Sequence, residues 1–349
     1  MITIVVGTRP QIIKTSLIIK ELASREIPYK LIHTGQHYDD ELSGNIFKTL
    51  EIPNPDFNLY IGSLASSKSV ISKILEGVGW LLNKDVVLVP GDTNSALGAA
   101  IAAVKNDCHL IHLEAGCRSY DMSMPEEVNR RMIDHISHSL LAPTRNCVKN
   151  LADERVLGDS YWFGDTMYDL FLKEFPYVVE MDKYVLATIH RDFNTDNGER
   201  LKTILDQLGE LEYDVMIPAH PRLSFNILKH GITLSDNIDI GLPLDYTDFI
   251  ALMKHAECVV TDSGGVQKEA FWSRIPCVTV RPNTEWKETL TFEWNILTEP
   301  ASIADKVHYT VNRSHPSLNV EDEFGYGDTS KKIVDWITSE FNIKYDKVK

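Results

Sequence analysis

The sequence predicts an α/β protein with two Rossmann-like domains that face each other across a cleft. Short apolar segments alternate with amphipathic helical segments, and this alternation begins again after about residue 165. Strands that alternate with helices form parallel sheets whose two faces are covered by helices. The length of 349 residues also exceeds that of one ordinary compact domain.

The first half contains short, apolar, β-branched segments that predict buried strands. These segments cover residues 2–6, 30–33, 86–89, 110–113 and 140–142. Helical periodicity lies between them at residues 10–22, 66–82 and 95–104. Together these elements predict a first domain over residues 1–167.

The second half repeats this pattern. Predicted strands cover residues 184–188, 215–218, 238–240, 258–261 and 277–280, and predicted helices cover 197–211, 247–254 and 266–272. They define a second domain over residues 168–328, joined to the first near residues 166–183. A last helix at 330–341 follows an irregular acidic stretch, and we expect the segment 329–349 to pack back on the first domain.

The composition is that of a soluble globular protein, with 43% apolar and 24% charged residues. The net charge of −15 argues against a broad basic surface for nucleic acid. We expect no membrane span, because no stretch reaches the apolar length that one requires. The first residues form a predicted strand rather than a signal peptide, so the expected location is the cytoplasm.

The cysteines and histidines do not predict a metal site or a disulfide framework. The five cysteines are irregularly spaced and are interpreted as small buried apolar residues: Cys108, Cys117, Cys147, Cys258 and Cys277. Most histidines are interpreted as structural, namely His109, His112, His135, His138, His220 and His255. Neither GxGxxG nor GxxxxGK[ST] occurs, so we expect no metal and no cofactor.

A basic segment follows the first predicted strand. Gly7 and Thr8 lead into Arg9 and Pro10, and Lys14 follows one turn later. Backbone N–H groups at a helix N-terminus, flanked by two cations, favour an anion. The alternative is an ordinary strand–helix turn with two solvated cations.

Acidic residues follow other strands of the first domain. Asp92 lies in PGDTNS, Glu114 in HLEAG and Glu126 in MPEEVNR. Taken singly, two of these residues have simpler interpretations: Asp92 could cap the helix that follows it, and Glu126 could complement a helix dipole. Several convergent carboxylates at strand ends instead favour general acid/base chemistry.

The second domain carries a predicted nucleotide-binding segment. Ser263, Gly264 and Gly265 follow a strand and open a helix, where their N–H groups can bind a diphosphate. Glu269 follows four residues after Gly265, and a carboxylate there can accept both hydroxyls of a ribose. A plain glycine-rich turn is the alternative. His190 follows the strand 184–188 and points toward the same predicted cleft.

These segments together resemble the non-hydrolysing UDP-N-acetylglucosamine 2-epimerases over nearly the whole chain. The matching motifs are GTRPQIIK (7–14), HTGQHYDDELS (33–43), PGDTNS (90–95), HLEAGCRS (112–119), MPEEVNR (124–130), APT (142–144), FGDTMYD (163–169), IHR (189–191), TDSGGVQKEA (261–270) and RPNTEW (281–286). The resemblance implies a fold like that of the GT-B glycosyltransferases, with UDP between two Rossmann-like domains.

The resemblance also implies a reaction. UDP is eliminated in the anti sense across C1–C2, 2-acetamidoglucal and UDP remain bound, and UDP adds back to give the 2-epimer without NAD or metal. Arg9 and Lys14 would contact the phosphate side, and Asp92, Glu114 and Glu126 would be the acid/base carboxylates. His190 would lie at the diphosphate, and a homodimer is implied. The implied UDP-binding residues are Ser263, Gly264, Gly265 and Glu269, with Phe249 at the uracil ring and Arg281 beside it.

Three departures from the family pattern bear on the substrate. Gln11 stands where GTRPE is usual, Trp286 replaces an arginine, and Asp192-Phe193-Asn194 replaces a Glu-Asn pair after HR. Gln11, MPEE and TEW resemble the branch that acts on UDP-2,3-diacetamido-2,3-dideoxy-glucuronate, which is the alternative substrate. A GT-B glycosyltransferase, a non-enzymatic nucleotide-sugar sensor and the hydrolysing epimerases are further alternatives.

Overall fold

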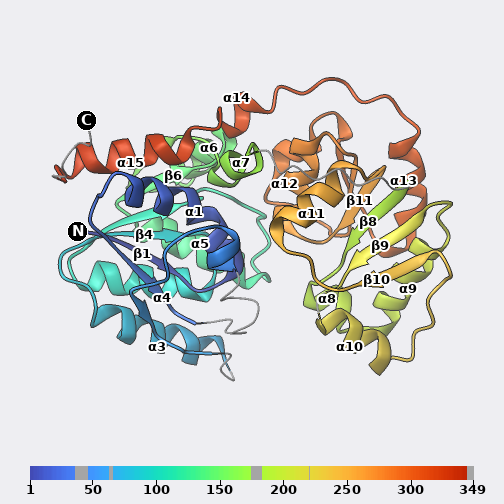
Figure 1. Ribbon diagram of the computed structural model, residues 1–349, viewed down its shortest axis with the longest axis horizontal. Coiled ribbons are helices and arrows are strands. Elements are labelled where there is room, and N and C mark those ends of the chain that lie inside the picture. Colours follow the sequence, from blue (N-terminus) through green and yellow to red (C-terminus); the bar gives the residue numbers. More distant parts are fainter. Residues whose placement is uncertain (36–45, 63–65, 174–182, 220, 344–349) are drawn as a thin grey trace. The chain divides into compact units, whose positions relative to one another are not determined.

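The computed structural model of the chain describes residues 1–35, 46–62, 66–173, 183–219 and 221–343 (Figure 1). It divides into unit 1, Met1–Lys173 with Val320–Lys349, and unit 2, Glu174–Asn319. Each unit contains one parallel sheet with helices, which confirms the predicted α/β class with two Rossmann-like sheets. Motif residues 36–43, His220 and residues 174–182 of the predicted linker lie outside the described residues.

Unit 1 contains a parallel sheet with the order β3-β2-β1-β4-β5-β6-β7. Its strands are β1 (Ile2–Val6), β2 (Tyr29–His33), β3 (Phe57–Asn58), β4 (Val86–Pro90), β5 (His109–Leu113), β6 (Ser139–Ala142) and β7 (Asp159–Trp162). Its helices are α1 (Arg9–Ser24), α3 (Ser67–Gly79), α4 (Asn94–Lys105), α5 (Pro125–Ile136), α6 (Arg145–Asp153), α7 (Thr166–Phe171), α14 (Glu321–Phe324) and α15 (Thr329–Glu340). In Figure 1, α1 and α15 lie on one side of this sheet and α3 and α4 on the other.

Unit 2 contains a parallel sheet with the order β10-β9-β8-β11-β12-β13. Its strands are β8 (Tyr184–Thr188), β9 (Asp214–Pro218), β10 (Ile238–Gly241), β11 (Cys258–Thr261), β12 (Cys277–Thr279) and β13 (Asn295–Leu297). Its helices are α8 (Asp192–Thr195), α9 (Gly198–Gly209), α10 (Pro221–Lys229), α11 (Tyr246–Lys254), α12 (Gly264–Ser273) and α13 (Ile303–Val311), with 3-10 turns at Lys287–Glu293 and Pro300–Ser302.

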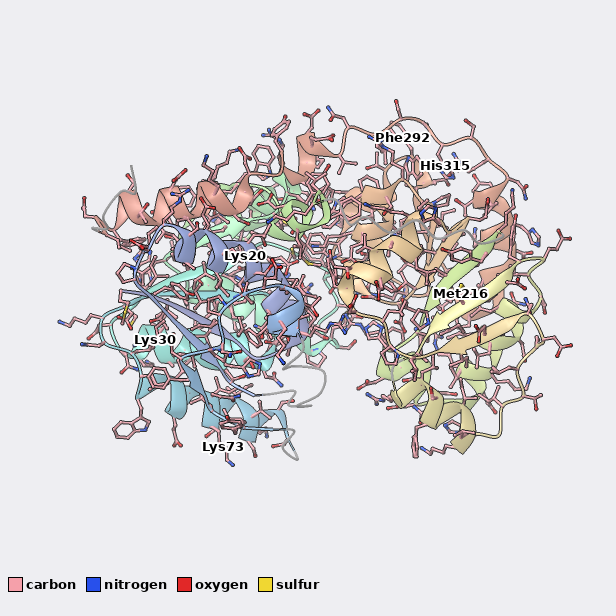
Figure 2. The ribbon with its side chains drawn as sticks, viewed as in Figure 1. Lys20, Lys30, Lys73, Met216, Phe292 and His315 are labelled. Atoms are coloured by element: carbon pink, nitrogen blue, oxygen red, sulfur yellow. The ribbon has the colours of Figure 1, made fainter. Side chains whose placement is uncertain are left out.

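Both faces of the central strands are buried, which explains why these segments are almost entirely apolar. In β8, Val185 and Ala187 belong to the core cluster shared with α9 and α13. Tyr184 and Leu186 belong to the cluster on the opposite face, against α11 and α12. Met216 of β9, labelled in Figure 2, packs partly buried against this second cluster. Alternate side chains of a strand point to opposite faces, so a strand buried on both faces is apolar at nearly every position.

The C-terminal segment lies in unit 1. The N–H groups of Thr329 and Ser330 donate to the carboxylate of Asp169 over 3.1 and 2.6 Å. The ring of Trp336 lies 4.9 Å from that of Tyr161. Because Asp169 belongs to α7, these contacts hold α7 in unit 1, and the division falls after residue 173 rather than after the predicted residue 167.

The strand order reverses direction at one point in each sheet. In unit 1 this point lies between β1 and β4, and in unit 2 it lies between β8 and β11. The loops after these neighbouring strands leave toward opposite faces and open a crevice at the carboxyl edge, where ligands bind in open parallel sheets. We call the two places switch point 1 and switch point 2.

None of the helices in the described ranges is long and apolar enough to cross a membrane. All five cysteines are buried free thiols.

Candidate active site

Switch point 1 begins at the turn from β1 into α1. The N–H of Gly7 donates to Oε1 of Gln11 over 2.9 Å, and Nε2 of Gln11 donates to the carbonyl oxygen of Pro90 over 2.8 Å. Gln11 therefore joins the ends of β1 and β4. A glutamate, which is usual at this position in the resembled family, could not donate the second hydrogen bond. The first turn of α1 is Arg9-Pro10-Gln11 and carries no acidic side chain, which leaves its N-terminus suited to an anion.

Lys14 and Glu114 form an ion pair at this edge. Glu114 follows β5 with a φ of +70°, and Gly91 follows β4 with a φ of +67°. A Cβ atom on Gly91 would lie 3.2 Å from Nζ of Lys14 and 3.5 Å from Oε2 of Glu114. Glycine at position 91 thus permits both the left-handed turn and the close approach of the pair.

Asp92 and Glu126 complete the acidic group. Asp92 pairs with Arg130 of α5, and Nδ2 of Asn129 donates to the carbonyl oxygen of Asp92 over 2.9 Å. Glu126 lies in the first turn of α5 and is partly exposed. The structure therefore places the Lys14–Glu114 pair beside Gly91, with Asp92 as the next residue of the chain, and it places Arg9 and Glu126 in the first turns of α1 and α5.

Switch point 2 joins His190, after β8, to Asp262, after β11. Nδ1 of His190 lies 2.9 Å from Oδ1 of Asp262. The backbone N–H of Arg191 and the side-chain amide of Asn194 each donate to Oδ2 of Asp262 over 3.0 Å. Burial alone would raise the pKa of Asp262, but the hydrogen bond and charge of His190 and these donors together lower it below its usual range. A buried carboxylate therefore orients a half-exposed histidine.

The N-terminus of α12 lies beside this pair. Ser263 is its N-cap, with Oγ accepting from the N–H of Val266, and Gly264 and Gly265 form the first turn. All three are partly exposed. A Cβ on Gly264 would lie 2.5 Å from Oε1 of Glu285, so a larger residue here would displace the Glu285 side chain. The first turn carries no acidic side chain, which suits it to an anionic group.

The remaining predicted residues of unit 2 are more buried. Arg281 is 1% exposed and its Nη2 lies 2.8 Å from Oε2 of Glu285. Glu269 is 4% exposed on α12. Phe249 lies partly buried on α11 against the same core cluster as Leu252.

Sequence reasoning missed three residues that hold this site together. Asp262, Arg130 and Gln11 contact predicted site residues or their strands, but we assigned none of them a role. A signal existed for Asp262, because an acidic residue directly after a buried strand is costly unless it is paired. Arg130 lies four residues after Glu126, which is the spacing of neighbours on a helix face.

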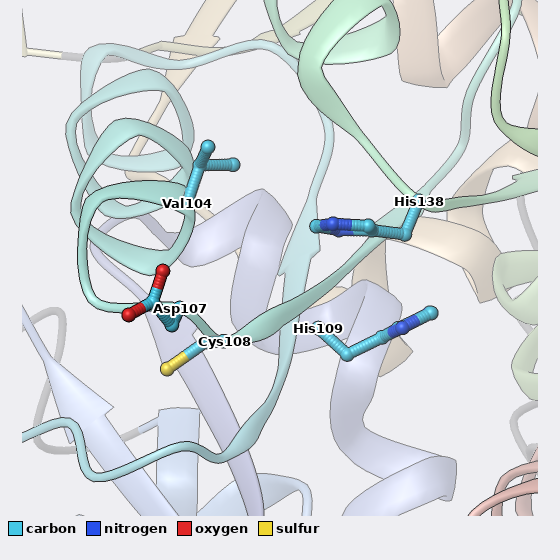
Figure 3. A pocket seen from close by; sticks show the side chains of 5 residues that line it. All are labelled: Val104, Asp107, Cys108, His109 and His138. Carbon is cyan, nitrogen blue, oxygen red and sulfur yellow. The ribbon is translucent and has the colours of Figure 1, made fainter.

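One surface hollow, of about 360 Å³, lies away from switch point 1 (Figure 3). It is lined by Val104, Asp107, Cys108, His109 and His138. His109 begins β5, whereas the candidate residues lie at the carboxyl ends of the strands. In the described part of the chain, no group of three or more His, Cys, Asp or Glu side chains could hold a metal ion.

Comparisons with known proteins agree on one family. Residues 20–338 match the family described as UDP-N-acetylglucosamine 2-epimerase. A UDP-N-acetylglucosamine 2-epimerase homolog of Methanococcus maripaludis is 40% identical, over 96% of this chain and 98% of its own. A UDP-2,3-diacetamido-2,3-dideoxy-D-glucuronate 2-epimerase of Pseudomonas aeruginosa is 35% identical, over 95% and 98%. The crystal structure of the Methanocaldococcus jannaschii UDP-GlcNAc 2-epimerase with UDP-GlcNAc and UDP matches with a TM-score of 0.90 at 36% identity, over 97% of this chain and 99% of that one.

Proposed function

This chain belongs to the UDP-N-acetylglucosamine 2-epimerase family, and we propose that it interconverts UDP-N-acetylglucosamine and UDP-N-acetylmannosamine without hydrolysing them. The observation that carries this proposal is the group of Asp92, Lys14 and Glu114 around Gly91 at switch point 1. Inversion of a carbon that bears hydrogen needs a proton removed from one face and returned to the other, and carboxylates can do both.

The proposed reaction has two steps. A base removes the C2 proton, the C–H electrons form a C1=C2 double bond, and the C1–O bond breaks with its electrons leaving on UDP. A proton then adds to the opposite face of C2 while an oxygen of UDP adds back to C1. No atom is oxidised overall, so the reaction needs no redox cofactor.

In the proposed mechanism, switch point 1 handles the protons. Asp92, Glu114 and Glu126 are the candidates for base and acid. Lys14 forms an ion pair with Glu114 and can hold its carboxylate in place. Arg9, at the N-terminus of α1, is assigned to the phosphate side, where charge develops as UDP departs.

Switch point 2 is proposed to bind UDP. Ser263, Gly264 and Gly265 would bind the diphosphate through backbone N–H groups, and His190 would donate to it while Asp262 holds the ring. Glu269 is assigned to the ribose, Phe249 to the uracil and Arg281 to the support of the neighbouring Glu285.

A second candidate substrate is UDP-2,3-diacetamido-2,3-dideoxy-glucuronate. The relative that acts on this sugar is 35% identical, and Gln11 and Trp286 resemble that branch. We also propose a homodimer, a cytoplasmic location and a role in polysaccharide biosynthesis. These three rest on the family's habit and on the free thiols of the buried cysteines.

The test is incubation of the purified protein with UDP-N-acetylglucosamine and no acceptor, followed by chromatography of the UDP-sugars. UDP-N-acetylmannosamine should appear and reach an equilibrium mixture from either side. A parallel incubation with the diacetamido-glucuronate compares the two substrates. Turnover only after an acceptor is added would favour a glycosyltransferase, and binding without turnover would favour a sensor.

A further inference from the structure

Charged side chains of unit 1 form a closed ring behind switch point 1. Acidic and basic groups alternate along it in the order Asp92, Arg130, Glu127, Arg131, Glu154, Arg118, Asp134 and His112. His112 then closes the ring, since its Nε2 lies 2.9 Å from the carbonyl oxygen of Gly91, the residue before Asp92.

One face of α5 supplies half of this ring. Glu127, Arg130, Arg131 and Asp134 recur at helical spacing, so their side chains lie on one side of the helix. Glu127 accepts from Arg130 over 3.1 Å and from Arg131 over 3.3 Å. Arg131 in turn lies 3.0 Å from Glu154 of the loop after α6.

The other arc lies deeper. The side chains of His112, Asp134 and Arg118 are all 0% exposed. Nη1 of Arg118 lies 2.7 Å from Oδ2 of Asp134, and Nδ1 of His112 lies 2.6 Å from Oδ1 of Asp134. The backbone N–H of Gly116 also donates to Asp134, over 3.2 Å.

Both ring nitrogens of His112 face groups that accept hydrogen bonds. The carbonyl oxygen of Gly91 can only accept. Asp134 is ion-paired with Arg118 and also accepts from the N–H of Gly116, which fits an ionised carboxylate whose other oxygen accepts from Nδ1 of His112. Nδ1 and Nε2 must then each carry a hydrogen.

We propose that His112 is a buried imidazolium that closes this ring and fixes the Gly91–Asp92 turn through its hydrogen bond to the carbonyl oxygen of Gly91. Four acidic groups then alternate with three arginines and one histidine cation around the ring.

The position of His112 links the ring to the proposed chemistry. It holds the carbonyl oxygen of the residue before Asp92, and it lies on β5 two residues before Glu114, which directly follows that strand. Through these two links, His112 fixes the backbone that carries both carboxylates. His112 is a positioning residue, and this role in turnover rests on the proposed epimerase function.

The protonation state of His112 can be measured by NMR on the full chain labelled with 15N-histidine. The variant His112→Gln assigns the His112 signals, and His135→Gln, an exposed histidine on the same α5, is the matched control. We expect both nitrogens of His112 to be protonated at neutral pH, with a slowly exchanging, downfield Nδ1 proton. A His112 with one protonated nitrogen overturns the proposal, whatever the activity.

Its positioning role is measured by kinetics. His112→Ala should lower kcat about tenfold to a hundredfold, the usual cost of losing a group that orients a site from behind. KM and UDP affinity should stay near wild type. His112→Gln should recover part of kcat, because its amide can still donate to Gly91, and His135→Gln should change nothing.

Unchanged kcat in His112→Ala would refute the positioning role. Equal loss in the alanine and glutamine variants would also contradict it, because the donor to Gly91 would then be irrelevant. If His112→Ala does not fold, the kinetics of His112→Gln still test the positioning role, and the NMR measurement still tests the protonation of His112. Absence of epimerisation by the wild-type protein would refute the proposed function while leaving the NMR result to decide the imidazolium.

Discussion

Switch point 1 and switch point 2 share one strand order, yet different kinds of groups line them. At switch point 1, charged side chains dominate, with Lys14 paired to Glu114 and Asp92 paired to Arg130. At switch point 2, two glycines open α12, and backbone and amide N–H groups hold the buried Asp262. The proposed function thus assigns acid/base chemistry to unit 1 and anion binding to unit 2 on the same topology.

Strand order therefore determines where a ligand can bind in each sheet, but not which chemistry takes place there. The residues after each strand decide that. Substitutions at switch point 1 should therefore lower the rate of epimerisation, whereas substitutions at switch point 2 should weaken the binding of UDP.

The largest expected effect is at switch point 1. Asp92→Asn, Glu114→Gln and Glu126→Gln should each lower kcat about a hundredfold to ten-thousandfold, because each removes a candidate proton carrier. UDP affinity, measured by calorimetry, should change little. Glu76→Gln, on the exposed face of α3, is the control. A variant that keeps near-full turnover removes that residue from the mechanism.

The next effect is at switch point 2. Glu269→Ala should weaken UDP binding roughly tenfold to a hundredfold, since hydrogen bonds to charged groups contribute on the order of 1.5–3 kcal/mol. Turnover at saturating substrate should fall far less than in the carboxylate variants of unit 1. Glu299→Ala, an exposed acid in the same unit, should bind UDP normally. Unchanged UDP affinity in Glu269→Ala would place the nucleotide elsewhere.

A smaller effect concerns the stability of unit 2. The pKa of Asp262 is lowered in the folded state, so the stability from its ionisation is present above its unfolded pKa of about 3.9 and is lost as pH falls further, through the folded value. Asp262→Asn should cost about 2 kcal/mol at neutral pH. The difference from wild type, followed by calorimetric melting, should shrink below about pH 4. A constant difference across this range would show that the charge is not the cause, and Asp192→Asn, an exposed acid on α8, should change stability little.

The smallest expected effect is that of chelation. EDTA should leave epimerisation intact, because the account assigns every step to side chains and backbone N–H groups. Activity lost on chelation and restored by one divalent ion would show that the carboxylates of switch point 1 hold a metal.

Much of the fold could be predicted from the sequence because the central strands are buried on both faces. β1, β4, β8 and β11 are apolar apart from single threonines in β1, β8 and β11, and polar or glycine residues follow them. Of the outer strands, β10 was predicted, but β3, β7 and β13 could not be found this way. β3 has two residues, β13 has three, and β7 begins Asp-Ser, so none shows the apolar run of a central strand.

The candidate site could be predicted only in part. The carboxyl ends of parallel strands meet at one edge of a sheet. The glycines and carboxylates that follow strands therefore predicted sites at these edges, with Asp92 in the first domain and Ser263 in the second. The pairing of Asp92 with Arg130 and the hydrogen bonds of Asp262 depend on side chains that meet only in the folded chain. His112 gave no signal, because a histidine within a buried strand is usually structural.

The most direct test of the central claim is epimerisation in D2O, followed by proton NMR of the UDP-sugars. If switch point 1 removes the C2 proton and returns one from solvent, deuterium should appear at C2 of both epimers. Asp92→Asn and Glu114→Gln should slow this exchange, while Glu269→Ala should preserve it at saturating substrate. Product that retains its original C2 hydrogen would contradict the account.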